Sequence, residues 1–147
     1  MSQKRKETPS EKAQRIDRWT EILFKALSAR AAKRWRFASF RGAGGGEWRG
    51  IVDVLAVRKN TAKPGDSRLK RGDLFELILV QMKGGSARMP NEEEKKRLEA
   101  VKQRYGAKEV VLFCWKEGKG CTFSKLTGME WIVSSPTEIF GLKSTAS

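Results

Sequence analysis

The sequence of 147 residues contains no histidine and only two cysteines, Cys114 and Cys121. The lack of an imidazole excludes histidine general bases, Ser-His-Asp and Cys-His nucleophile systems, and metal sites with histidine ligands. Two cysteines are too few for a four-cysteine zinc site or a disulfide framework, so we expect reduced thiols and a cytoplasmic protein. A cross-strand disulfide is a less favoured alternative, if Glu117 and Gly118 form a tight hairpin.

Long hydrophobic runs are also absent. No apolar stretch approaches the ~20 residues that a membrane span requires, and the charged N-terminus does not resemble a secretory signal. We therefore expect no association with a membrane.

Positive charge is abundant. Lys and Arg number 31 against 17 Asp and Glu, which gives a formal net charge of +14. An excess of this size indicates a polyanionic partner, and nucleic acid is the first candidate. A basic RNA-associated or ribosomal-type protein would also explain the charge.

The length predicts one domain of common size, with residues 1–8 as a flexible basic arm, 9–142 as the domain and 143–147 as a C-terminal tail. Thr8-Pro9-Ser10-Glu11 is a capping box, and it predicts a helix over 9–31 with a buried stripe of Ile16, Trp19, Leu23 and Leu27. Further strands are predicted near 34–40, 51–57, 74–83, 109–115, 121–125 and 130–133. Further helices are predicted from Glu92 to Gly106 and after Ser135. This order predicts an α/β fold whose central sheet is mixed.

Three polar residues stand out because they lie on two otherwise apolar strands. Asp53 interrupts the run 51–57, while Gln81 and Lys83 project from one face of the strand 74–83. If the two strands pair as an antiparallel hairpin, the Asp53 carboxylate approaches the other two side chains. A buried carboxylate and a buried ammonium are each costly unless they pair or bind an ion, so we expect the three groups to form a site.

These residues, taken with the order of the elements, resemble the PD-(D/E)XK nuclease superfamily, in particular its Mrr-like and Holliday-junction-resolvase-like branches. The matching motifs are Glu21 on the first helix, Asp53 in Gly50-Ile51-Val52-Asp53-Val54, and Gln81-Met82-Lys83 before Gly84. The resemblance covers roughly residues 10–115 and implies a restriction-endonuclease-like αβββαβ core. Val52 replaces the proline of the family motif, and Gln81 replaces its acidic residue, which lowers the negative charge available to a cation.

The resemblance implies a Mg²⁺- or Mn²⁺-dependent nuclease that hydrolyses phosphodiester bonds in DNA. Like a junction resolvase, it would select its substrate by DNA structure. Asp53, the Gln81 amide, the Met82 carbonyl and Glu21 through water would hold the cation, and Lys83 would assist the attacking water. A domain this small leaves little room for a module that reads base sequence, so we expect structure-directed or partner-directed cleavage, with a homodimer as one arrangement. The alternative is a catalytically inactive nucleic-acid-binding module on the same fold. Glu21 lies off the apolar stripe of its helix, so a solvent-facing role beside Lys25 is equally consistent with the sequence.

Basic residues cluster in the loop that joins the two strands of the predicted site. We expect phosphate contacts from the following residues, which include two arginines that precede the loop: Arg41, Arg49, Arg58, Lys59, Lys63, Arg68, Lys70 and Arg71. The alternative is a loop whose basic side chains contact solvent and bind no phosphate. Contacts of this kind would supply affinity and positioning but little sequence preference.

Overall fold

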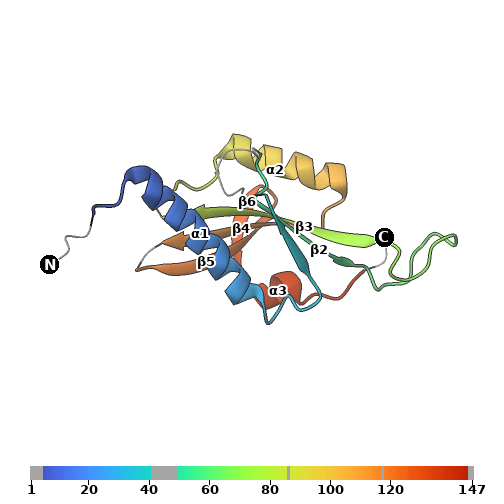
Figure 1. Cartoon of the computed structure of the whole chain (residues 1–147). Helices are drawn as coiled ribbons and strands as arrows, with labels where there is room; N and C mark the ends of the chain where they lie inside the picture. The colour runs from blue at the N-terminus through green and yellow to red at the C-terminus, as the bar shows by residue number, and fades with distance from the viewer. Residues whose placement is uncertain (1–4, 41–49, 86, 117, 146–147) are drawn as a thin grey trace.

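The computed structural model describes residues 5–40, 50–85, 87–116 and 118–145 (Figure 1). Three helices and six strands follow one another in these segments. In chain order they are α1 (Pro9–Ser28), β1 (Arg36–Ser39), β2 (Val54–Lys59), β3 (Phe75–Gly84), α2 (Glu92–Tyr105), β4 (Glu109–Lys116), β5 (Gly120–Thr127), β6 (Glu130–Ser134) and α3 (Pro136–Phe140).

The six strands form one mixed sheet in the order β1-β2-β3-β4-β5-β6. Neighbouring strands are antiparallel except β3 and β4, which are parallel because α2 carries the chain back between them. The predicted α/β class with a central mixed sheet flanked by helices is therefore confirmed. The first six elements also follow the αβββαβ order that the family resemblance implies.

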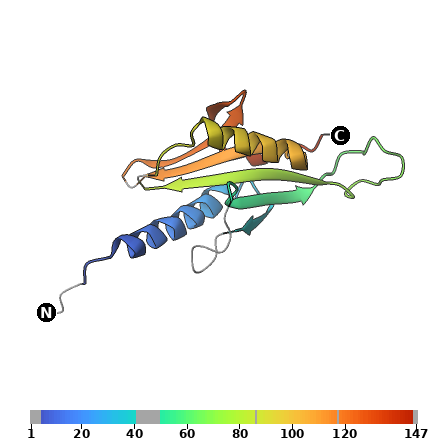
Figure 2. The ribbon, with the colours of Figure 1, turned by 90° about the horizontal axis from the view of Figure 1, so that it is seen from above.

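The helices cover both faces of the sheet, and Figure 2 shows α1 and α2 on opposite sides of it. On the face covered by α1 and α3, Phe24 lies at the centre of an aromatic cluster with Phe37, Phe113, Phe123 and Phe140. On the other face, Leu98 of α2 packs with apolar residues of the strands, among them Leu79, Val110 and Leu126. This second face also carries the polar side chains of Gln81 and Lys83 near the end of β3, which contact Glu94 of α2.

The buried side of α1 differs from the predicted stripe. Trp19 and Leu27 are about half exposed, whereas Thr20, Phe24 and Ser28 are fully buried. The prediction holds for Leu23, which packs against the core, and for the partly buried Ile16. It is wrong for Trp19 and Leu27 because it ranked residues by hydrophobicity alone. Where a helix lies this close to a sheet, small polar side chains fit the contact better than large apolar ones. Thr20 satisfies its hydroxyl within the helix, by donating to the Ile16 carbonyl oxygen at 2.6 Å.

The close approach of α1 depends on a glycine at the end of β3. A Cβ atom on Gly84 would overlap the Thr20 hydroxyl and would lie 2.8 Å from Cγ2 of Ile16. We expect Gly84→Ala to lower the free energy of unfolding by about 1–3 kcal/mol, since the helix must move or the side chains must leave their rotamers. Urea denaturation measures the change. Gly50→Ala is the matched control, because no atom of the described residues lies within 4 Å of the added carbon, and an equal loss in both variants would contradict this account.

Strand β2 begins later than the sequence predicts. The expected strand was 51–57, but the ladder with β3 starts at the pair Val54 and Val80 and continues to Lys59 and Phe75. Asp53 therefore lies directly before β2 and not in its middle. The apolar pattern locates the buried segment correctly, but it cannot show at which residue backbone pairing starts. The connecting loop is correspondingly 60–74, and it projects beyond the sheet in both views (Figures 1 and 2).

The two cysteines are free, as the favoured prediction has it. Cys114 pairs in register with Thr122, and Cys121 pairs with Trp115. Adjacent positions along a strand point to opposite faces, so the two thiols face away from each other and the alternative of a cross-strand disulfide is wrong. Among the described residues, no helix is both long enough and apolar enough to cross a membrane.

Candidate functional site

Asp53 is fixed against β3 by two hydrogen bonds. Its backbone N–H donates to the Val80 carbonyl oxygen at 2.9 Å, and its carboxylate Oδ2 accepts from the Met82 N–H at 2.7 Å. The carboxylate thus takes the place that a backbone carbonyl would have if the ladder continued. It contacts the backbone of the residue between Gln81 and Lys83, and its approach to their side chains stays a prediction.

Gln81 is only 5% exposed and carries an unpaired polar atom. Its Nε2 donates to Oε2 of Glu94 at 3.4 Å, whereas its Oε1 is buried without a hydrogen-bond partner among the described residues. A buried carbonyl oxygen that lacks a donor costs about 1–3 kcal/mol, so such atoms call for an explanation such as a water or an ion.

Glu94 completes the group, and sequence reasoning missed it. Its Oε2 lies 3.6 Å from the Lys83 ammonium, and both side chains are about one-quarter exposed. The residue is held at this point because Asn91 caps α2 and accepts from the Glu94 N–H at 2.9 Å, which fixes the first turn of the helix. The sequence signal was present as the acidic first turn of the helix, but this signal is explained equally well by the helix dipole alone.

The oxygen atoms at this end of β3 fit a hard divalent cation. Asp53 and Glu94 would supply carboxylates, and the buried Oε1 of Gln81 would supply a neutral oxygen that accepts no hydrogen bond from the described part of the chain. Mg²⁺ binds oxygen ligands of these kinds and retains several waters, so one amide and two carboxylates are a sufficient protein contribution. Within the described segments, no group of three or more His, Cys, Asp or Glu residues could hold a metal.

Glu21 lies on α1, the helix on the opposite face of the sheet from α2. Its carboxylate is 3.4 Å from the Lys25 ammonium, one turn further along the helix. This ion pair is the solvent-side role that the sequence left open, and the role of Glu21 as a water-mediated ligand stays a prediction. The Met82 carbonyl likewise stays a predicted ligand, while the Met82 side chain is buried in the core on the α1 face.

Cys114 borders the site, because it pairs in register with Lys83 across β3 and β4. Its Sγ lies 3.6 Å from Sδ of Met89. Burial raises the pKa of the Cys114 thiol above its ordinary value, and the nearby positive charges of Lys116 and Lys83 oppose this only in part. This direction of shift disfavours the thiolate form of Cys114.

Arg58 is the predicted phosphate ligand whose contacts differ most from expectation. Its Nε is 2.6 Å from Oε2 of Glu76, and the two side chains are only 9% and 7% exposed. The guanidinium also donates to the Leu142 carbonyl oxygen at 2.6 Å and lies 4.4 Å from the Trp35 ring centroid. These contacts engage the side chain within the protein and argue against a phosphate contact.

The other predicted phosphate ligands of this loop are exposed or partly exposed. Lys59 lies over the Phe75 ring at 5.4 Å, and Lys63 and Lys70 are exposed. Arg68 forms a bidentate pair with Asp66, and this hydrogen bond lowers the pKa of the Asp66 carboxyl. The remaining candidates are Arg71, which is exposed, and Arg41 and Arg49, which lie outside the described residues.

Comparison with known proteins gives limited information. No protein-family model and no curated protein matches the sequence. Among solved structures, the chain is similar to Hjc of Archaeoglobus fulgidus, a Holliday junction resolvase from an archaeal hyperthermophile. The two share 15% sequence identity over 86% of this chain and 93% of that chain, with a TM-score of 0.42. A likeness at this level assigns neither a family nor an activity, so the fold stands on the sheet order and the helices described above.

Proposed function

We propose that the protein is a metal-dependent nuclease that hydrolyses phosphodiester bonds in DNA. The observation that carries this proposal is the buried Oε1 of Gln81, which has no hydrogen-bond partner among the described residues. It belongs to the stretch of β3 where Asp53 accepts from the Met82 N–H and where Glu94 contacts Gln81 and Lys83. Most buried polar atoms of a structural cluster are satisfied, whereas an oxygen that binds a cation can stay without a hydrogen-bond donor, which supports a cation site here. The net charge of +14 supports a polyanionic substrate.

The residues have distinct roles in this proposal. Asp53 is held in one orientation by the Met82 N–H, so it presents a preorganised carboxylate. Lys83, held by Glu94, stabilises the negative charge that develops on the phosphate oxygens and orients the attacking water. A bound Mg²⁺ or Mn²⁺ would supply polarisation of the phosphate and would make the water a better nucleophile. The same proposal includes DNA as the partner, selection of the substrate by DNA structure, and a homodimeric assembly.

A nuclease assay tests it directly. We expect the protein to cut branched or linear DNA in Mg²⁺ or Mn²⁺ and to stop when EDTA is added. Asp53→Ala and Lys83→Ala should each lower the rate by about 10²- to 10³-fold, whereas Lys95→Ala on the neighbouring helix should cut normally. Gel electrophoresis of labelled branched, linear and single-stranded DNA measures the rates. Cutting that survives in both site variants would contradict the proposal.

A second candidate is an inactive nucleic-acid-binding module, and Gln81 is the observation in its favour. A neutral amide at this position leaves Asp53 and Glu94 as the carboxylates of the site, which weakens attraction to a cation. This module would bind DNA equally well with or without metal, would not cut it, and would keep its affinity in Asp53→Ala and Lys83→Ala. Tight RNA binding with weak DNA binding would instead favour an RNA-associated protein.

A further inference from the structure

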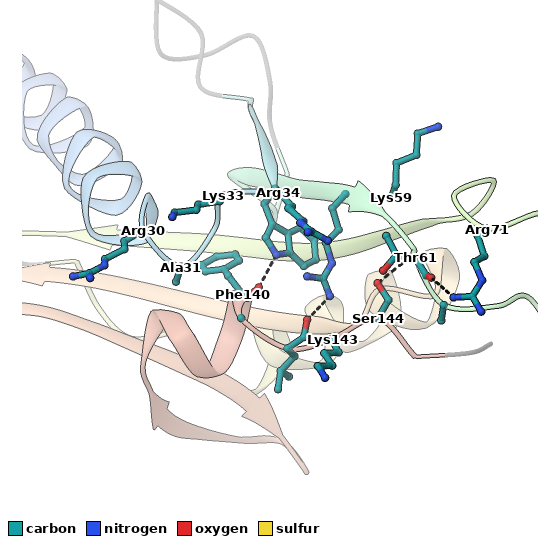
Figure 3. A pocket seen from close by; sticks show the side chains of 15 residues that line it. Arg30, Ala31, Lys33, Arg34, Lys59, Thr61, Arg71, Phe140, Lys143 and Ser144 are labelled. Carbon is teal, nitrogen blue, oxygen red and sulfur yellow. Dashed lines mark hydrogen bonds between the residues drawn. The ribbon is translucent and has the colours of Figure 1, made fainter.

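A basic cavity lies at the far end of β2 from the candidate metal site. Asp53 precedes the first residue of β2 and Lys59 ends it, so the two places are about 20 Å apart along the strand at ~3.3 Å per residue. The cavity has a volume of about 590 Å³ and is formed by the turn after α1, the end of β2, the loop 60–74 and the chain after α3 (Figure 3). These segments are distant in the sequence, so the cavity is a product of the fold.

The described residues that line the cavity include many positive charges and no acidic residue. Six of its basic residues form no ion pair with any acid in the described segments: Arg30, Lys33, Arg34, Lys59, Arg71 and Lys143. Like charges gathered around one cavity repel one another, and a bound anion relieves this repulsion. Arg58 is different, because it lies in the floor and is neutralised by Glu76.

The walls favour phosphate groups over nucleobases. The aromatic rings of the cavity, Trp35 and Phe140, are only 4% and 1% exposed, and Arg58 already stacks on Trp35. No free ring face is therefore offered to a base by these two residues, while backbone and hydroxyl groups of Thr61 and Ser144 form the wall between the loop and the C-terminal chain. Recognition without base stacking tracks the sugar-phosphate backbone.

We propose that this cavity binds successive phosphate groups of a nucleic-acid strand, at a site separate from the one where the strand is cut. The inference rests on the proposed function only in taking nucleic acid as the substrate. It needs no cleavage, so binding can be measured in EDTA. The cavity holds a part of the nucleic acid that lies away from the scissile bond, and it contributes affinity without reading sequence.

The test compares two triple variants with the same loss of charge. In Lys33→Gln, Arg34→Gln, Lys143→Gln the changes lie at the cavity, and these exposed side chains form no hydrogen bond with other described residues. In the control, Lys96→Gln, Arg97→Gln, Arg104→Gln, they lie on the exposed side of α2. The probes are a fluorescent single-stranded DNA of about 20 nucleotides and inorganic tripolyphosphate, both in EDTA. Fluorescence anisotropy over a range of salt concentrations gives the affinity, and thermal unfolding checks that both variants fold.

We expect the cavity variant to bind the DNA at least about tenfold more weakly and the control to change much less. The slope of log affinity against log salt should fall by about 2, since each contact to a single strand contributes about 0.7. Arg71→Gln alone should lower the slope by about 0.7, the contribution of one phosphate contact.

Equal losses in the two triple variants, or an unchanged slope in the cavity variant, would overturn the inference. Tripolyphosphate that binds more tightly than DNA would also overturn it, by identifying a site for a small polyphosphate. If cleavage fails while the cavity variant still loses DNA binding, the proposed activity is wrong and the cavity assignment stands.

Discussion

Replacing Glu94 by glutamine is expected to lower the rate of DNA cleavage by about 10²- to 10³-fold, an effect as large as the loss of Asp53 or Lys83. The carboxylate lies 3.6 Å from the Lys83 ammonium and accepts from the Gln81 amide, so it acts on both groups. Without the Glu94 charge, Asp53 is the remaining carboxylate of the proposed site. Lys83 also loses the partner that orients it. The rate should therefore fall through both cation binding and positioning of the ammonium.

Two measurements separate these contributions. Titration calorimetry with Mn²⁺ should show weaker binding to Glu94→Gln, by about 10- to 100-fold if the carboxylate supports the ion. Glu93→Gln is the matched control, because Glu93 is the preceding residue of the same helical turn and is exposed. Normal cleavage by Glu94→Gln would show that Glu94 has no part in catalysis, and equal losses in both variants would show a general effect of charge on the helix. In either case the nuclease proposal would depend on Asp53, Gln81 and Lys83 without Glu94.

The difference between Asp53 and Glu94 shows which parts of the site a sequence can reveal. Asp53, Gln81 and Lys83 belong to one hairpin, so strand alternation and antiparallel pairing are enough to predict that they meet. Glu94 reaches them only because α2 packs on the same face of the sheet as Gln81, and the position of a helix on a sheet depends on contacts distant in the sequence. Its cap at Asn91 was readable, but the direction of the side chain was not.

The fold shows the same division. The order of helices and strands follows from local patterns, and α2 has the predicted bounds, because Asn91 and Gly106 are clear end signals. The buried side of α1 does not follow, since Thr20 is buried by the closeness of Gly84 and not by its own hydrophobicity. Arg58 was predicted to bind phosphate from its charge and loop position. Its partner, Glu76, is on the next strand, and only the register of the hairpin brings the two together.

That buried pair leads to the largest expected change in stability. Glu76→Gln should lower the free energy of unfolding by about 3–5 kcal/mol, because it leaves the Arg58 guanidinium buried without a counter-charge. Lys108, whose ammonium lies 3.8 Å from the other Glu76 oxygen, loses its partner as well. Urea unfolding followed by tryptophan fluorescence measures the loss. Trp35 reports on the surroundings of the ion pair because Arg58 stacks on its ring.

An exposed ion pair provides the control for this stability change. Glu11→Gln removes a carboxylate that pairs with Arg5 at 2.6 Å on the surface, and a change of about 0–1 kcal/mol is expected there. The double variant Arg58→Met, Glu76→Leu should recover much of the loss, since apolar side chains of similar size avoid the cost of burying charge. Recovery would show that the penalty arises from an unpaired charge. If Glu76→Gln is no less stable than Glu11→Gln, the guanidinium is hydrated in solution, and Arg58 is then free to contact phosphate as the sequence predicts.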